Sequence, residues 1–151
     1  MMRSYRRRAM LLAAALAASA GLPAAAAAHG SVRVQQIDGR VSHYDDVRLE
    51  LSGNTLRVIS PDRVGTLVVD KAACSYVGSV QRCLPYSLTL SQHGTHHITL
   101  DRGTVYLNLT SRPQTLPLSS RIVPPRGIVA LLRTHRGTFI SITGRLDEVN
   151  Q

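Results

Sequence analysis

The sequence predicts an all-β protein, built as a single antiparallel β-sandwich or small barrel of about nine strands after a cleaved N-terminal signal peptide. Three observations support this prediction. Short runs alternate apolar and polar residues, which is the period of a strand with one buried face. Glycine-containing turn signals separate these runs at short intervals. After the first 28 residues, no segment shows a convincing helical period.

The N-terminal segment, residues 1–28, has the layout of a secretory signal peptide. Arginines 3, 6, 7 and 8 precede an apolar, alanine-rich stretch and a run of small residues at 24–28. Cleavage after Ala28 is the simplest choice, although the alanine run leaves other sites open. Residues 29–151 then form a single β domain, since they are too few for two.

An uncleaved membrane anchor is the alternative interpretation of the same segment. Alanine is only weakly apolar and Pro23 interrupts the stretch, so both features favour cleavage. We therefore expect a periplasmic or secreted protein, with no transmembrane span in the mature chain.

Charge and composition restrict the class of partner. The leader holds four of the 18 basic residues, which leaves 14 basic against nine acidic side chains in the predicted domain. The arginines are scattered along the chain, and only five tyrosines and one phenylalanine are available for base stacking, so we expect no nucleic-acid binding. An envelope protein, or an anionic polysaccharide or lipid, remains the expected partner.

The two cysteines, Cys74 and Cys83, both lie in the predicted exported part. In an oxidising compartment they are expected to form a disulfide. Because the chain has no further cysteine, a thiolate metal site is not expected.

The first half of the predicted domain alternates in short strands. A strand with Val32 and Val34 on one face runs to a turn at Asp38-Gly39, and Pro61 ends the hairpin that follows. The remaining expected elements are a hairpin of residues 47–51 and 56–58, a strand at 67–69, and a short strand or ordered loop at 76–80.

Residues 86–110 predict an antiparallel meander of three strands. Glycine-containing turns are expected at 92–94 and 101–103, because glycine supplies the positive φ that such turns need.

The proline-rich strap, residues 111–126, contains four of the seven prolines and interrupts the hairpin rhythm. A connection of this length is expected to cross between sheets or to cover an opening. The apolar run 128–132 follows and predicts the most buried strand, or a short helix. A turn at 135–137, a strand at 138–143 and a polar end at 144–151 complete the expected chain.

Six histidines are the densest group of reactive side chains. His96 and His97 are neighbours on a predicted strand, so they point to opposite faces. His93, in the preceding turn, is the natural companion of His97. Solvated or packed histidines are the simpler interpretation, and the candidate metal ligands are His29, His93 and His97.

Cleavage after Ala28 would place His29 at the mature N-terminus. Its free amine and imidazole, with a second histidine, suit copper. An exported β domain that begins His29-Gly30 resembles the start of bacterial lytic polysaccharide monooxygenases, and also periplasmic copper-binding proteins of the copper-resistance type. The resemblance covers these two residues and implies a copper-binding alternative function.

No sequence motif indicates an enzyme: a nucleophile elbow, a phosphate loop and a dinucleotide fingerprint are all missing from the sequence. The leading hypothesis is an exported, disulfide-stabilised, non-enzymatic binding or structural module without a cofactor. Its candidate partner-binding residues are Arg82, Arg112 and Arg121, which lie in the cystine loop (75–82) and the strap. A glycosylation sequon at Asn108 is attributed to chance.

Overall fold

The computed structural model describes residues 26–52, 54–62, 65–70, 73–116 and 121–146. These residues form twelve strands and no helix. Among them there is accordingly no helix with the length and apolar character needed to cross a membrane. The predicted leader lies outside the described residues, except for its last three. The strands are β1 (Ala26–Gln35), β2 (Val41–Ser52), β3 (Thr55–Ile59), β4 (Thr66–Asp70), β5 (Cys74–Val77), β6 (Val80–Cys83), β7 (Ser87–Ser91), β8 (Thr95–Asn108), β9 (Gln114–Thr115), β10 (Ile122–Val123), β11 (Gly127–Thr134) and β12 (Phe139–Leu146).

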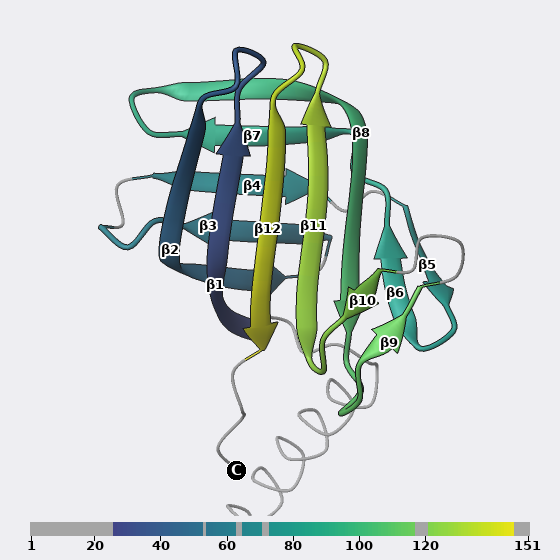
Figure 1. The fold of residues 1–151 in the computed structure, drawn as a ribbon. Helices are drawn as coiled ribbons and strands as arrows, with labels where there is room; N and C mark the ends of the chain where they lie inside the picture. Colours follow the sequence, from purple (N-terminus) through teal and green to yellow (C-terminus); the bar gives the residue numbers. More distant parts are fainter. Residues whose placement is uncertain (1–25, 53, 63–64, 71–72, 117–120, 147–151) are drawn as a thin grey trace, which may run out of the picture.

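Eight of these strands close into an antiparallel barrel. Their order is β11-β12-β1-β2-β3-β4-β7-β8, and β8 pairs back onto β11 (Figure 1). The predicted all-β class is therefore confirmed, and of the two expected architectures the protein adopts the barrel. The β5–β6 hairpin extends the sheet from the free edge of β8, and β9 pairs with β10 in a separate small sheet.

The barrel consists of two layers that cross. In Figure 1, β2, β1, β12 and β11 stand upright in front, while β3, β4 and β7 run across behind them. Two strands belong to both layers. The second half of β2 pairs with β3, and β8 pairs with β7 through residues 95–99 and with β11 through residues 100–107. The layers are thus joined by strands that bend from one into the other.

The path of β8 corrects one prediction. The expected turn at 101–103 is wrong, because the strand continues through it from Thr95 to Asn108. Gly103 does not have a positive φ. Instead, a Cβ atom there would lie 2.9 Å from the carbonyl oxygen of Pro85 and 3.1 Å from a methyl carbon of Leu100. This glycine therefore permits a close approach where the strand bends, and the meander has two strands rather than three.

Three of the other predicted glycine turns are confirmed, whereas Gly65 lacks the expected positive φ and Gly53 of the predicted turn at 52–54 lies outside the described residues. Gly39, Gly94 and Gly137 have φ values of 90°, 120° and 88° in the turns that follow β1, β7 and β11. Gly78, with a φ of 62°, joins β5 to β6, so the segment 76–80 is the turn of a hairpin.

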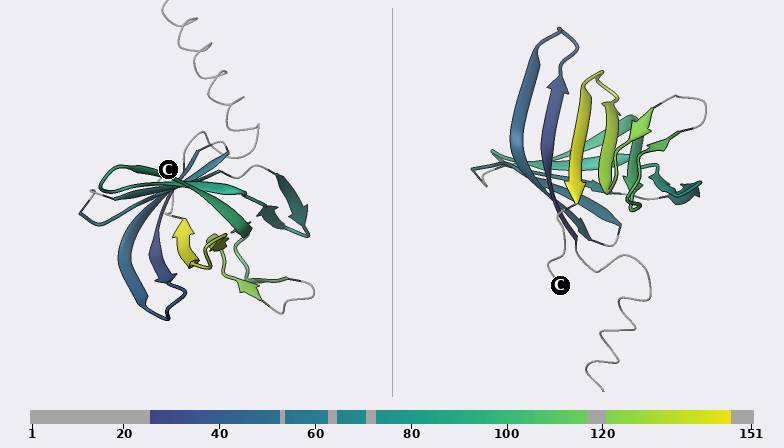
Figure 2. Two further views of the ribbon diagram at one scale, coloured as in Figure 1. Left: turned by 90° about the horizontal axis from the view of Figure 1, so that it is seen from above. Right: turned by 60° about the horizontal axis from the view of Figure 1, so that its bottom comes forward.

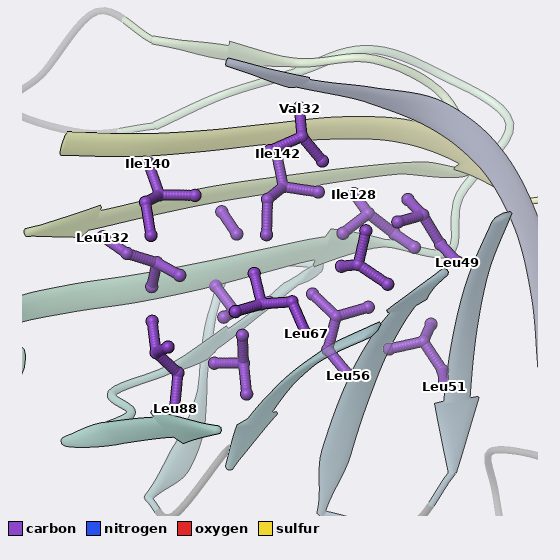
Figure 3. Packing of buried hydrophobic residues seen from close by; sticks show 14 of the residues in the cluster. Val32, Leu49, Leu51, Leu56, Leu67, Leu88, Ile128, Leu132, Ile140 and Ile142 are labelled. Atoms are coloured by element: carbon purple, nitrogen blue, oxygen red, sulfur yellow. The ribbon is translucent and has the colours of Figure 1, made fainter. Parts of the chain in front are cut away.

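The main core fills the barrel. Leucine, isoleucine and valine side chains from both layers meet there, and Figure 3 shows this packing. The labelled residues are Val32, Leu49, Leu51, Leu56, Leu67, Leu88, Ile128, Leu132, Ile140 and Ile142. Leu49 lies directly over Gly144, where a Cβ atom would collide with its methyl group. The Leu49 side chain therefore fills the space that the absent side chain of Gly144 leaves in the barrel interior.

A second core lies on the outer side of the barrel. Val80, Leu116, Val123 and Val129 are buried there, between β6, β9, β10 and β11. Strand β11 contributes side chains to both cores, which explains its continuous run of apolar residues. The prediction that residues 128–132 form the most buried strand is confirmed. The strap covers this outer face. It neither crosses between layers nor covers an opening of the barrel, because the strands it connects, β8 and β11, are hydrogen-bonded neighbours.

Both ends of the described domain differ from expectation. Strand β12 continues to Leu146, which is buried in the main core, so the chain is not polar from 144 onward. Strand β1 begins at Ala26, before the predicted domain boundary, and Ala28 is fully buried. Ala28 pairs with Leu49 of β2 and Leu146 of β12.

The close contact between β1 and β12 generates a stability prediction. A Cβ atom at Gly30 would collide with the carbonyl oxygen of Thr143 and lie 2.7 Å from Cα of Gly144, and all of these are backbone atoms. Gly30→Ala should lower the free energy of unfolding by about 2–3 kcal/mol, measured by urea denaturation. The control is Gly65→Ala, where the nearest atom would be Ser60 Oγ at 3.5 Å. Equal stability of the two variants would contradict the prediction.

Candidate functional site

The two adjacent histidines of β8 occupy opposite faces, as predicted. His96 pairs with Leu90 and lies on the inner face, whereas His97 pairs with Thr89 on the outer face. The Nδ1 atom of His97 is 3.1 Å from the hydroxyl oxygen of Thr89. This hydrogen bond engages Nδ1, so Nε2 is the nitrogen of His97 that a metal ion would use.

Of the three candidate metal ligands, His29 lies on β1, whereas His93 and His97 belong to the β7–β8 hairpin. His29 is in β1 and pairs with Arg48 and Arg145, His93 is in the β7–β8 turn, and His97 is on the outer face of β8. Within the described residues, no group of three or more histidine, cysteine, aspartate or glutamate side chains could hold a metal ion. The structure therefore does not bring these histidines together.

The copper hypothesis also depends on the chain terminus. In the structure His29 is an internal residue of β1, and the buried Ala28 precedes it. A cut that exposes the α-amine of His29 would remove Ala28 from the core and Ala26–Ala28 from their pairing with β2. Cleavage at that point would thus remove part of the first strand.

The predicted disulfide between Cys74 and Cys83 is present. The two residues pair directly across the β5–β6 hairpin, with Cα atoms 4.0 Å apart. Cys83 is buried in the main core while Cys74 is exposed. The disulfide therefore attaches the outermost strand, β5, to the barrel, and it is typical of proteins that fold outside the reducing cytosol.

The two segments predicted to bind a partner lie side by side. Val80 of the β5–β6 hairpin packs with Leu116 and Val123 of the strap in the second core. Figure 1 shows the hairpin and strands β9 and β10 on the same side of the barrel, and the view from above in Figure 2 agrees. We call this surface, formed by residues 74–83 and the described part of the strap, the side platform.

A buried asparagine, Asn108, fastens the strap to the barrel. Its Nδ2 group donates hydrogen bonds to the carbonyl oxygens of Arg112, Val123 and Pro124 at 2.8, 3.1 and 3.1 Å. Its Oδ1 atom accepts hydrogen bonds from the backbone amide and the hydroxyl group of Thr110. One fully buried side chain thus satisfies carbonyl groups at both ends of the strap. The same contacts leave the sequon at Asn108 inaccessible in the folded protein.

All three candidate arginines lie on the side platform. Arg82 is half-buried in β6, while Arg112 and Arg121 are exposed in the strap. The structure adds Arg126, at the end of the strap. The Nε atoms of Arg82 and Arg126 are buried and have no hydrogen-bond partner within the described part of the chain. Buried donors of this kind normally have an acceptor.

The net positive charge of residues 26–146 lies in their second part, residues 73–146, which includes the side platform. Residues 73–146 contain eight arginines and a single acidic residue, Asp101, whereas residues 26–72 contain six basic and six acidic residues. The carboxylate of Asp101 is ion-paired with Arg133 at 3.4 Å. The arginines themselves are evenly scattered, with five in residues 26–72 and eight in residues 73–146, and the excess of positive charge arises because acidic residues are scarce between 73 and 146, before Asp147 and Glu148.

No protein-family model matches this chain, and no curated protein matches it by sequence.

The role of Asn108 can be tested by substitution. Asn108→Ala should lower the free energy of unfolding by about 3 kcal/mol, because buried carbonyl groups of the strap lose their donor. Proteolysis within the strap should also become faster. Asn54→Ala, in the exposed β2–β3 turn, should change stability by less than about 0.5 kcal/mol. A stable and protease-resistant Asn108→Ala protein would show that other contacts hold the strap.

The start of the mature chain can be tested separately. A protein that begins at His29 should be about 1–2 kcal/mol less stable than one that begins at Ala26, because it loses the buried methyl group and the pairing of Ala28. Urea denaturation measures this difference, and intact mass of the exported protein should show that Ala28 is retained. An exported protein that begins at His29 and binds copper tightly would instead support the copper alternative.

Proposed function

We propose that this chain is an exported, non-enzymatic binding module of the periplasm or the secreted fraction, and that its side platform binds an anionic polysaccharide of the cell envelope. The observation behind the proposal is the convergence of two segments distant in sequence. They bring Arg82, Arg112 and Arg121 onto one surface, within the part of the chain that has a large excess of arginine.

Arginine chemistry supports an anionic partner. The guanidinium group forms bidentate hydrogen bonds with carboxylate, phosphate and sulfate groups, and it keeps its charge at all relevant pH values. The guanidinium groups of the exposed Arg112 and Arg121 are donors that such a group could reach, whereas the unpartnered Nε atoms of Arg82 and Arg126 are buried. Exposed apolar side chains on the same side, Tyr76 and Ile122, provide flat contact area for sugar rings.

A binding role suits the platform better than a catalytic one. The described residues of the platform include no histidine, aspartate or glutamate, and both cysteines are in the disulfide. A general base is therefore missing from this part of the surface. The second core and Asn108 hold the platform rigid, which lowers the entropy lost on binding.

Export itself is supported by the leader predicted in residues 1–28 and by the disulfide.

The double variant Arg112→Gln/Arg121→Gln tests the proposal. Its affinity for a carboxylated polysaccharide such as alginate should fall at least about five-fold, because two charge-assisted contacts are lost. The affinity of the unaltered protein should also decrease with added salt. The matched control, Arg33→Gln/Arg57→Gln, removes the same charge from exposed positions on β1 and β3.

Equal losses in the two double variants would show a non-specific charge effect and contradict the platform as a site. Failure of the unaltered protein to bind any anionic polysaccharide, together with capture of a protein partner that depends on Arg112 and Arg121, would assign the platform to a protein instead.

A further inference from the structure

The barrel core is open at one end. Val34, Leu90 and Ile98 pack against the buried cluster but remain partly exposed. They come from β1, β7 and β8, and so from both layers of the barrel. All three line a single hollow of about 420 Å³, which we call the barrel mouth. Its lining residues come from the end of β1, from β7, from the start of β8 and from the β11–β12 turn, segments that Figure 1 shows toward the top of the barrel.

The apolar floor of the mouth continues along the barrel wall. A second hollow of about 290 Å³ shares Val34 and Leu90 with the first and extends to Tyr44, Val58 and Leu67. Tyr44 pairs with Val32 and therefore lies on the inner face, yet 45% of its surface is exposed. The two hollows share Val34, Gln36 and Leu90, so they adjoin, and we call them together the channel; polar side chains such as Ser42, Gln92 and Thr138 line it beside the apolar ones.

The rim of the mouth is polar and ordered by hydrogen bonds. The Thr138 hydroxyl group is 3.3 Å from Gln36 Oε1, and the Thr138 amide donates to the hydroxyl oxygen of buried Thr134 at 3.1 Å. The amide of His135 donates to the carbonyl oxygen of Thr99 at 3.2 Å. The β11–β12 turn is thereby attached to both β1 and β8, so the mouth is largely preformed.

The mouth has one fixed positive charge among its lining residues, that of Arg136. Neither hollow is lined by an aspartate or glutamate, whereas Arg136 and three histidines, His96, His97 and His135, line the first. Among the acidic residues of the neighbouring segments, Asp38 pairs with Arg40 at 2.7 Å and Asp101 with Arg133 at 3.4 Å, while the exposed Asp45 and Asp46 follow Tyr44 in β2. An anionic group at the rim would therefore meet the guanidinium group of Arg136, and no carboxylate is among the residues that line the two hollows.

We propose that the barrel mouth binds an anionic amphiphile, a molecule with a single alkyl chain and a carboxylate or phosphate head group. The chain lies in the channel over Val34, Leu90 and Ile98, where it removes apolar surface from water. The head group stays at the rim beside Arg136 and His96. This site is separate from the side platform, and neither proposal depends on the other.

Another hollow, of about 510 Å³, is less suitable. It lies on the outer face and is lined by His29, Asp46, Arg48 and Glu50 among others, so both signs of charge are present. Arg48 and Glu50 already form an ion pair at 3.2 Å. This hollow therefore lacks both the continuous apolar floor and the single sign of charge found at the mouth.

The chain contains no tryptophan, which permits a site-specific optical test. Tyr44→Trp places a single indole in the channel, where the entry of an alkyl chain should shift its emission to shorter wavelength. The matched control is Tyr76→Trp on β5, a tyrosine 63% exposed on the side platform and outside both hollows. Its emission should not change.

Three ligands of equal chain length separate the contributions of chain and charge: decanoate, decanol and decyltrimethylammonium, each below its micelle concentration. We expect decanoate to bind most tightly to the Tyr44→Trp protein and the cation least tightly. Decyl phosphate tests whether phosphate replaces carboxylate. Adding Arg136→Gln should weaken decanoate binding about three- to ten-fold and leave decanol unchanged, while adding Arg57→Gln should change neither.

Equal affinity for all three head groups, or no effect of Arg136→Gln, would overturn the proposed preference for an anion. No response of the indole at position 44 to any of the ligands, in a protein shown to be folded by circular dichroism, would overturn the mouth as a site. Either result leaves binding of polysaccharide at the platform unaffected.

Discussion

The hydrogen-bonded ladder between β8 and β11 is the interaction on which the whole architecture depends. The first half of β8 pairs with β7 in the crossing layer, and its second half pairs with β11 in the upright layer. The pairing with β11 closes the sheet into a barrel. Without it, both strands would have free edges and the main core would be open along one side. The bend in β8 requires close contact between Gly103 and Pro85, which a residue with a Cβ atom would prevent.

Strand β8 also relates the two proposed surfaces to each other. Its upper half provides Ile98 and His96 to the mouth, and its lower half pairs with β6 and ends at Asn108, which fastens the strap. The side platform is thus built on the outside of the barrel and the mouth at one end of the inside. One bent strand therefore contributes to both the exposed, arginine-rich side platform and the channel, and it fixes their positions relative to each other.

The candidate residues show where reasoning from sequence succeeds. The two-residue period of a strand separated His96 from His97 correctly, because that separation is a local property of the backbone. The arginines at 82, 112 and 121 were chosen because irregular segments on rigid scaffolds often bind partners; the segments that carry them pack together, and their role in binding stays a prediction. The prediction of a turn at Gly103 was wrong. A glycine can be needed either for a positive φ or for a close approach of two backbone segments, and the sequence does not distinguish these two roles.

The sequence by itself determined the all-β class, most of the hairpin turns and the pairing of Cys74 with Cys83, since each depends on residues close together in the chain. Tertiary structure alone decided that the sheet closes into a barrel, because closure depends on pairing between β8 and β11 and between β1 and β12, strands distant in sequence. It also decided that Asn108 is a buried anchor and that Val34, Leu90 and Ile98 line an opening. Burial depends on which distant segments cover a residue, and no local pattern specifies that.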